Sequence, residues 1–239
     1  FMYALPYEDY EKFGVRRYGF HGTSHRYVSR RACEFLGEPY EKQRIITCHI
    51  GNGGSITAVK DGISVDTSMG LTPTEGLVMG TRVGDVDPGA LTYLMKCEGL
   101  DADGLTNVIN KKSGVFGISG ISSDMRDIED AIAAGNERAK LAMDMYEYRI
   151  LKYIGAYTAV LGGVDVIAFT AGVGENSPEL REAICEKLAY MGITLDKEAN
   201  RSRGKEVEIS GKDSKVKVVV IPTDEELVIA QDTAMIVGK

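Results

Sequence analysis

Residues 44 to 59 read RIITCHIGNGGSITAV, and this stretch decides the fold. Two runs of β-forming residues flank a turn that holds Gly51, Gly53 and Gly54. Because glycine has no side chain, a ligand can approach the backbone N–H groups of such a turn, and a row of these donors favours a phosphate. A Gly-Asn-Gly-Gly turn alone also fits an ordinary hairpin.

A second glycine turn lies far downstream, where residues 170–177 read TAGVGENS. It follows an apolar run at 164–169 and leads into a predicted helix with Ser177 at the cap and Pro178 in the first turn. The spacing fails the dinucleotide fingerprint at its third glycine, and the chain has no Gly-Lys-Ser/Thr of a P-loop. Two glycine turns at strand ends indicate a nucleotide held across a sheet.

Composition excludes several other classes. At 239 residues, one large domain or two small ones are possible, and the net charge of −7 argues against a nucleic-acid partner. No apolar run has membrane-spanning length, and we expect neither a membrane partner nor a signal peptide. The four cysteines form no Cys-x-x-Cys pair, which favours a reducing cytoplasm over a disulfide framework.

The predicted elements form one continuous order without repeats. Strands are expected at 45–50, 55–60, 63–66, 165–170 and 216–221. Helices are expected at 88–98, 104–112, 124–134, 137–161, 178–191 and 224–237. The glycine-rich stretch 67–88 is expected to be a long loop of functional character, since it carries Glu75, Arg82, Asp85 and Asp87. The stretch 195–214 is expected to loop over the surface. This order is typical of an α/β, ribonuclease-H-like (actin-like ATPase) lobe, a mixed sheet flanked by helices.

Five segments resemble signatures of the acetate kinase family, in the family's order. They are RYGFHGTSH (17–25), HIGNGGS (49–55), GTRVGD (80–85), SSDMRD (122–127) and AGVGENS (171–177). The resemblance covers essentially the whole chain. It implies that residues 1–239 form the C-terminal, nucleotide-binding lobe of such a kinase. The first lobe, with three polar groups of the site, is then expected before Phe1, and the closing helix is expected to pack on it.

The resemblance implies transfer of the γ-phosphoryl of ATP to acetate, giving acetyl phosphate and ADP, reversibly. Such chemistry needs positioning and charge neutralisation. By resemblance, Arg82 stabilises charge on the transferring group, His21 donates a hydrogen bond to it, and Glu225 holds Mg²⁺. A guanidinium suits this task because its planar fork matches phosphate oxygens.

The resemblance also implies a nucleotide site and an acid pocket. The nucleotide residues are His49, Gly51, Asn52, Gly53, Gly54, Asp124, Met125, Arg126, Gly172, Val173, Gly174 and Asn176. Phe20 and Pro73 are expected to form two walls of a methyl-sized pocket for the small carboxylic acid. Since one methylene changes binding by only about 1–3 kcal/mol in such a pocket, propionate is expected to be a poorer but real substrate.

Three alternatives stay open. The first is a zinc hydrolase built on His21, His25 and His49, although Gly22 inside the first pair argues against a helix there and no Glu-x-x-His follows. The second is an isolated lobe that binds nucleotide and dimerises without catalysis. The third is a propionate or butyrate kinase. By resemblance the lobe forms a homodimer, and the long helix 137–161 suits an interface.

Overall fold

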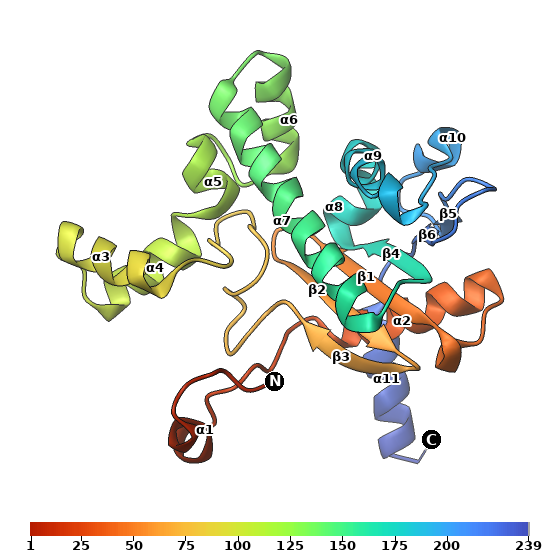
Figure 1. Cartoon of the computed structure of the whole chain (residues 1–239), viewed down its shortest axis with the longest axis horizontal. Coiled ribbons are helices and arrows are strands. Elements are labelled where there is room, and N and C mark those ends of the chain that lie inside the picture. The colour runs from red at the N-terminus through yellow and green to blue at the C-terminus, as the bar shows by residue number, and fades with distance from the viewer. Residues whose placement is uncertain (239) are drawn as a thin grey trace. The chain divides into compact units, whose positions relative to one another are not determined.

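The computed structural model describes residues 1–238, which form two compact units (Figure 1). Unit 1 comprises residues 1–20, 52–54 and 68–150. Unit 2 comprises residues 21–51, 55–67 and 151–238.

Unit 2 is built on a six-stranded mixed sheet with the strand order β3-β2-β1-β4-β6-β5. The strands are β1 (Arg44–Ile50), β2 (Gly54–Lys60), β3 (Ile63–Thr67), β4 (Val166–Thr170), β5 (Val207–Glu208) and β6 (Lys217–Val220). β1, β4 and β6 are parallel neighbours, whereas β3 and β5 pair antiparallel with β2 and β6. The expected mixed sheet is therefore present, and every strand predicted from the sequence belongs to it.

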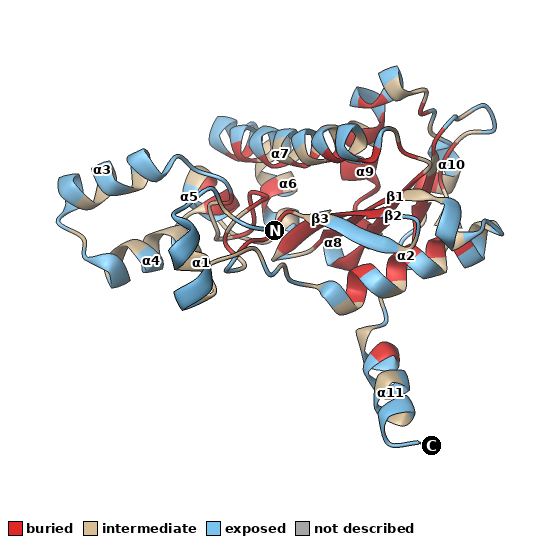
Figure 2. Cartoon of the chain, turned by 60° about the horizontal axis from the view of Figure 1, so that its bottom comes forward, coloured by how far each residue is buried: buried red, intermediate tan, exposed pale blue. Residues whose placement is uncertain are grey.

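Helices cover both faces of this sheet, and β1, β2, β4 and β6 are almost wholly buried, whereas the edge strand β3 is largely exposed (Figure 2). α2 (Gly22–Leu36) packs on one face through Val28, Ala32 and Cys33, which meet Ile45 and Val166 of the strands. The other face is covered by α9 (Pro178–Lys187) and by residues 151–161 of α7. Near-continuous apolar strands are what a sheet buried on both faces requires.

The second glycine turn differs from its prediction because it is helical. Residues 171–176 form the short α8 (Ala171–Asn176), directly after β4. The helix that follows begins as expected, since the hydroxyl of Ser177 accepts from the backbone N–H of Leu180 and Pro178 is the first residue. α9 ends at Lys187, and a 3₁₀ turn, η2 (Ala189–Met191), completes the predicted helical stretch.

The prediction of a surface loop at 195–214 was wrong in part. This segment contains α10 (Lys197–Asn200) and the edge strand β5, and it buries Asn200 and Ile209. The reason is Arg181, whose fully buried guanidinium donates to the side-chain and main-chain oxygens of Asn200 and to the main-chain oxygen of Ser202. A buried charge needs such partners, so it orders a polar segment that has little apolar pattern of its own.

Two further helices complete the cover of unit 2. The 3₁₀ turn η1 (Tyr40–Lys42) precedes β1, and α11 (Glu225–Ile236) closes the described chain against α2. α11 buries Val228, whereas its other apolar side chains, Leu227, Ile229, Met235 and Ile236, are exposed. The expected closing helix is present.

Unit 1 is helical around a long irregular loop. Its helices are α1 (Tyr7–Phe13), α3 (Pro88–Glu98), α4 (Ala102–Lys111), α5 (Gly114–Ser119), α6 (Met125–Ala133) and residues 137–150 of α7 (Glu137–Leu161). The loop from residue 68 to 87 has neither helix nor strand, as predicted. No helix in the described residues is both long and apolar enough to cross a membrane.

Candidate active site

The predicted phosphate turn, nucleotide helix and metal carboxylate each follow one of three neighbouring parallel strands. Gly51 follows β1, Gly172 lies just after β4, and Glu225 comes shortly after β6. The carboxyl ends of parallel strands share one edge of a sheet, and ligands of α/β proteins bind outside that edge. The sheet thus brings the beginnings of these segments of unit 2 to one side.

Three imidazoles lie together beside this edge. The rings of His21 and His49 stack with centroids 4.0 Å apart and planes 13° from parallel. His25 is tilted against both, at 6.4 Å and 6.0 Å between centroids. His21 precedes α2, His25 lies within it, and His49 lies near the end of β1. The start of α2 and the end of β1 therefore form one cluster.

Hydroxyl groups hold these rings. Nδ1 of His21 and Nε2 of His25 both lie near Oγ of Ser55, at 2.9 Å and 2.7 Å. Nδ1 of His25 is 2.7 Å from Oγ1 of Thr47. His25 thus uses both ring nitrogens on neutral hydroxyls, which fixes its plane.

Burial keeps two of the imidazoles uncharged. It lowers the pKa of His49 to about 3, with the neighbouring His21 adding to the effect. It also lowers the pKa of His25 well below its ordinary value, and His49 and His21 act in the same direction. A low-dielectric site disfavours the charged form of a base. Both rings are therefore neutral at physiological pH, each with one N–H donor and one acceptor.

This geometry argues against the three-histidine zinc site. His25 has no nitrogen left for a metal, because Thr47 and Ser55 occupy both. The described residues hold no group of three His, Cys, Asp or Glu side chains suited to a metal ion. The doubt about a helix at Gly22 was wrong: α2 begins at that residue, because His21 turns the chain with a φ of 59° and leaves Gly22 as the first helical position.

α8 carries four of the predicted nucleotide residues of unit 2. Gly172 and Asn176 are exposed, and the Asn176 amide donates to the main-chain oxygen of Gly172 at 2.9 Å. Val173 lies between them, and Gly174 packs against β1, where an added Cβ would lie 3.5 Å from the main-chain oxygen of Cys48. The helix starts at Ala171 with a φ of 65°, a strained conformation for a residue with a side chain.

Glu225 fits the role of a metal ligand. It is the first residue of α11 and is half-buried, and no described residue forms a hydrogen bond or ion pair with its carboxylate. Mg²⁺ commonly takes one or two carboxylates and completes its shell with phosphate oxygens and water. The neighbouring Asp224 is already used, since its carboxylate caps α11 by accepting from the N–H of Leu227 at 2.9 Å.

In unit 1, Arg82 and Pro73 lie together. The Arg82 guanidinium donates to the main-chain oxygen of Pro73 at 3.3 Å and contacts the sulfur of Met79 at 3.8 Å. The guanidinium is half-buried and is held by neutral groups. An arginine held in this way keeps its charge available for an anion.

Asn52 is tied to the same loop. The N–H of Gly80 donates to the main-chain oxygen of Asn52 at 3.1 Å. A Cβ on Gly80 would lie 2.2 Å from the side-chain oxygen of Asn52, so a larger residue here would displace the Asn52 side chain. Gly53 and Gly54 complete the turn, and Gly54 is buried.

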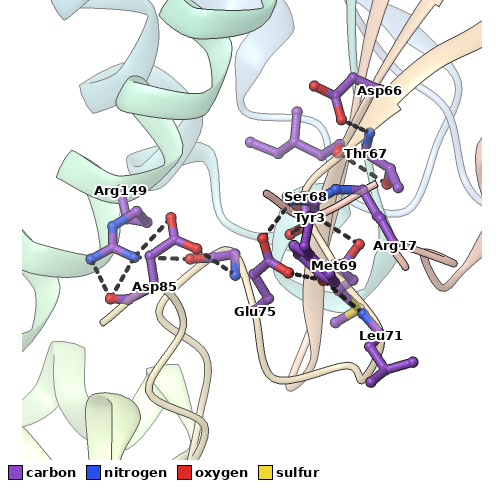
Figure 3. A network of polar contacts seen from close by, with 12 residues as sticks. Tyr3, Arg17, Asp66, Thr67, Ser68, Met69, Leu71, Glu75, Asp85 and Arg149 are labelled. Atoms are coloured by element: carbon purple, nitrogen blue, oxygen red, sulfur yellow. Dashed lines mark hydrogen bonds and ion pairs between the residues drawn. The ribbon is translucent and has the colours of Figure 1, made fainter. Parts of the chain in front are cut away.

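Two clamps of charged groups, built on Arg17 and on Arg149, fix the loop (Figure 3). The first clamp holds the segment 68–75, and the second holds the segment 76–85. In the first, Arg17 pairs with Glu75 and donates to the main-chain oxygens of Ser68 and Met69, at 3.1 Å and 3.0 Å. The Tyr3 hydroxyl also donates to Glu75. Arg17 belongs to the motif at 17–25, but the motif does not indicate this role.

In the second clamp, Arg149 of α7 donates to the main-chain oxygens of Gly76, at 2.9 Å, and Asp85, at 3.2 Å. It also pairs with the Asp85 carboxylate at 3.3 Å. That carboxylate in turn accepts from the N–H of Gly76 at 2.9 Å. The loop that bears Arg82 is therefore closed on itself.

The remaining predicted residues of unit 1 lie on its surface. Phe20 is 37% exposed. Asp124 caps α6 and pairs with Arg126 at 2.6 Å, and this guanidinium lowers the pKa of Asp124 to about 2. Met125 begins α6 and is half-buried. The Asp124–Arg126 pair is open to solvent and can exchange partners with a ligand.

Sequence reasoning missed the residues that orient these groups. Ser24 and Ser55 stand inside the quoted motifs, but a motif does not show which ring a hydroxyl meets. Thr223 and Thr47 lie outside every motif. Ser24 and Ser55 lie within two residues of the start of α2 and of β2. Thr47 lies in the middle of β1 and Thr223 three residues after β6, so no local signal marked these two.

The sheet order and its flanking helices define the class of the protein. It is an α/β lobe of the actin-like ATPase type. The chain belongs to the acetokinase family, whose model matches residues 1–231.

Similar proteins support the same family. The chain is 66% identical over 239 residues to a Phocaeicola vulgatus protein named acetate kinase, covering all of this chain and 60% of that protein. It matches the crystal structure of Porphyromonas gingivalis acetate kinase with a TM-score of 0.97 and 63% identity, covering 99% of this chain and 60% of that one. It also matches a Francisella tularensis propionate kinase with a TM-score of 0.90 and 44% identity, covering 97% and 59%. The chain thus spans about three fifths of its relatives' length.

Proposed function

We propose that the full-length enzyme, a protein of its relatives' length that contains this sequence, transfers the γ-phosphoryl of ATP to acetate, reversibly. The observation that carries this proposal is the common edge of β1, β4 and β6, which presents the glycine turn, α8 and Glu225. Phosphate, adenosine and metal can each be met there by a different segment. The family membership supplies the class of acceptor.

In this proposal Arg82 supplies the positive charge that the transferring phosphoryl group needs. Its guanidinium is anchored on Pro73, so its position is set before the substrate arrives. His21 donates a hydrogen bond to the phosphoryl group, and its ring is fixed by Ser55. Glu225 would hold Mg²⁺, which neutralises charge on the phosphate oxygens when bound. Fixed donors of this kind stabilise developing charge without reorganising during the reaction.

The acceptor is proposed to be acetate, with propionate as a second substrate. Pro73 and Phe20 are the proposed pocket walls, and a pocket lined by apolar groups discriminates weakly against one added methylene. The similarity to a protein named propionate kinase supports the second acid.

A hydroxylamine trap for acyl phosphates tests the reaction. The full-length enzyme is given MgATP with acetate, propionate or butyrate. We expect the highest kcat/KM for acetate, with propionate lower by about 10- to 200-fold. A preference for butyrate would move the assignment to another acyl kinase, and no acyl phosphate from any acid would overturn the proposal.

We further propose that these 239 residues alone bind nucleotide weakly and transfer little, and that they form a homodimer. Closure of two lobes excludes water and completes a kinase site, whereas an open site leaves Arg82 hydrated. Calorimetric titration with MgADP, the acyl phosphate assay and sedimentation of the purified chain test the three statements. Turnover equal to that of the full-length enzyme would show that the second lobe is dispensable.

A further inference from the structure

A chain of hydroxyl groups ends on the ring of His49. The Thr223 hydroxyl donates to Oγ of Ser24 at 2.8 Å, and Oγ of Ser24 lies 2.8 Å from Nδ1 of His49. Thr223 follows β6, Ser24 is in the first turn of α2, and His49 is near the end of β1. This series of hydrogen bonds, from Thr223 through Ser24 to His49, thus joins three segments of unit 2.

The direction of these bonds follows from counting hydrogens. A hydroxyl has one hydrogen to donate and two lone pairs to accept with. Ser24 is fully buried, accepts the hydrogen of Thr223, and has one other hydrogen-bond partner among the described residues, Nδ1 of His49. If Nδ1 carried a hydrogen, Ser24 would accept twice and its own hydrogen would lack an acceptor in the core, which is unfavourable. Ser24 therefore donates to Nδ1.

We infer that Thr223 and Ser24 are positioning residues that hold His49 as its Nε2–H tautomer, so that Nε2 offers an uncharged N–H donor to a nucleotide phosphate. The identity of the ligand rests on the proposed function, whereas the tautomer does not. Nε2 of His49 has no hydrogen-bond partner among the described residues and is not among their buried unpaired atoms, so it is accessible.

Glu175 holds Thr223, the first residue of this series of hydrogen bonds, in place. One oxygen of its carboxylate accepts from the N–H of Ala171 at 2.8 Å and from the N–H of Thr223 at 3.2 Å. The backbone of Thr223 is thereby tied to α8, and its side chain is left to face Ser24. The same carboxylate thus couples the strained start of α8 to the orientation of His49.

An uncharged donor suits the surroundings of His49. The ring stacks on His21 at 4.0 Å, and burial lowers the pKa of His49 to about 3. Adding a proton would place a charge against a second imidazole and in a poorly hydrated place. A neutral ring then needs a defined tautomer, because only one nitrogen carries the hydrogen. The hydroxyl groups of Thr223 and Ser24 select the tautomer with the hydrogen on Nε2.

Nitrogen NMR of the 239-residue chain tests the tautomer directly. The chain has three histidines, so ¹⁵N labelling of histidine gives six ring signals. A His49→Asn spectrum assigns the pair of His49. We expect its Nδ1 to show the shift of an unprotonated nitrogen and Nε2 that of a protonated one. A protonated Nδ1 overturns the inference whatever the acyl phosphate assay gives.

Matched variants test the positioning residues. Thr223→Val removes the hydroxyl with little change in shape, and Thr223→Ser keeps it. We expect Thr223→Val to move the Nδ1 signal of His49 and to weaken MgADP binding by about 2- to 10-fold, the worth of a hydrogen bond. Thr223→Ser should match the unaltered chain in both respects. A Thr223→Val spectrum with unchanged His49 signals overturns the role of Thr223, and the signals of His25 report whether the variant is folded.

Addition of MgADP tests the ligand. We expect the Nε2 signal of His49 to shift on binding, while the signals of His25, which is 4% exposed and bonded at both nitrogens, stay in place. Inorganic phosphate serves as the probe without a nucleoside. An unmoved His49 at saturating MgADP, measured by calorimetry, overturns the phosphate contact. If the full-length enzyme transfers a phosphoryl group to none of the three acids, that result would overturn the proposed function and leave the tautomer of His49 unaffected.

Discussion

Two regions of the molecule hold their site residues in place by opposite kinds of interaction, charged in unit 1 and neutral in unit 2. In unit 1 the loop around Arg82 is held by charged groups, with Arg17 against Glu75 and Arg149 against Asp85. In unit 2 the ring of His49 is held by the neutral hydroxyl of Ser24 and has a pKa of about 3. Ion pairs at half-exposed positions fix where a loop lies. Buried hydroxyls fix which atom carries a hydrogen.

The difference between charged and neutral contacts follows from the structure that each region holds, an irregular loop in unit 1 and a buried ring in unit 2. A loop without helix or strand has many unpaired carbonyl groups, and a guanidinium satisfies several of them at once. A buried ring at a sheet edge cannot keep a charge without a partner, and its orientation must come from hydrogen bonds of defined direction. We therefore expect unit 1 to respond to the removal of charges and unit 2 to the removal of hydroxyls and to pH.

The largest effect is expected for Arg82→Ala in the full-length enzyme. Loss of an arginine that stabilises phosphoryl transfer lowers kcat by about 10³-fold or more. The affinity for MgADP, measured by calorimetry, should change little, since α8 and the glycine turn remain. Arg82→Lys keeps the charge without the planar fork and serves as the control, with a smaller loss. A near-normal kcat for Arg82→Ala would remove this residue from the mechanism.

Acid should unfold unit 2 through its neutral histidines. The pKa of His49 is about 3 in the folded chain, against an ordinary value near 6.5. Above pH 6.5 both states hold a neutral ring. Below it the unfolded chain binds a proton that the folded chain excludes, so stability falls as pH falls from 6.5 toward 3. For His49 the loss between pH 6.5 and pH 5 is about 1.6 kcal/mol, and His25 acts in the same direction.

Urea unfolding of the chain at several pH values measures how steeply the free energy of unfolding falls with pH. His49→Asn keeps an acceptor for Ser24 and removes one titrating group. The slope of its stability against pH should therefore be shallower than that of the unaltered chain by about 1.2 kcal/mol per pH unit between pH 5 and pH 6. Equal slopes would show that His49 is not held neutral, which would remove one side of the comparison.

A smaller effect is expected from Arg149→Met, which opens the second clamp. Gly76 and Asp85 lose their shared donor, and the loop that carries Arg82 is released. A misplacement of about 1 Å can cost about 100-fold in rate, so we expect kcat/KM to fall by about 10- to 100-fold. Arg138→Met is the matched control, since Arg138 donates to the main-chain oxygen of Ile118, outside the loop. If both variants lose activity equally, the clamp has no special role.

The sequence predicted the strands of the sheet well. Apolar strands such as 45–50 and the Asp61-Gly62 turn carry their structure locally, and both are present, with Asp61 at a φ of 52°. α2 was not predicted, because a glycine at its first turn resembles a loop signal. The order at 195–214 depends on the buried Arg181, a contact between distant residues that no local pattern shows.

The site residues show the same division. Resemblance to the family's motifs indicated Arg82 and His21, and glycine spacing indicated the two turns. Motifs could not indicate Thr223 as the partner of Ser24, since the two lie 199 residues apart and meet only through the sheet. Nor could they separate a charged histidine from a neutral one. That depends on burial, which a sequence does not measure.

The smallest effect is expected for Tyr3→Phe, at the outer end of the first clamp. The Tyr3 hydroxyl donates to Glu75 and accepts from the N–H of Leu71 at 2.9 Å (Figure 3). Burial and the bond to Glu75 raise the pKa of Tyr3, so the hydroxyl keeps its hydrogen at neutral pH. Its removal leaves the Arg17–Glu75 pair in place and costs about 0.5–1.5 kcal/mol in the free energy of unfolding.

Urea unfolding of Tyr3→Phe beside Tyr93→Phe measures this cost, because Tyr93 is 71% exposed and should give almost no change. High salt weakens the half-exposed Arg17–Glu75 pair by screening, so the clamp as a whole should weaken between 0.05 M and 0.5 M NaCl. The ring signals of His49 should stay unchanged by either treatment, because hydroxyls rather than charges hold that ring. A shift of the His49 signals in Tyr3→Phe or in high salt would show that the first clamp also affects the orientation of His49. The distinction between a loop held by charges in unit 1 and a ring held by neutral hydroxyls in unit 2 would then be wrong.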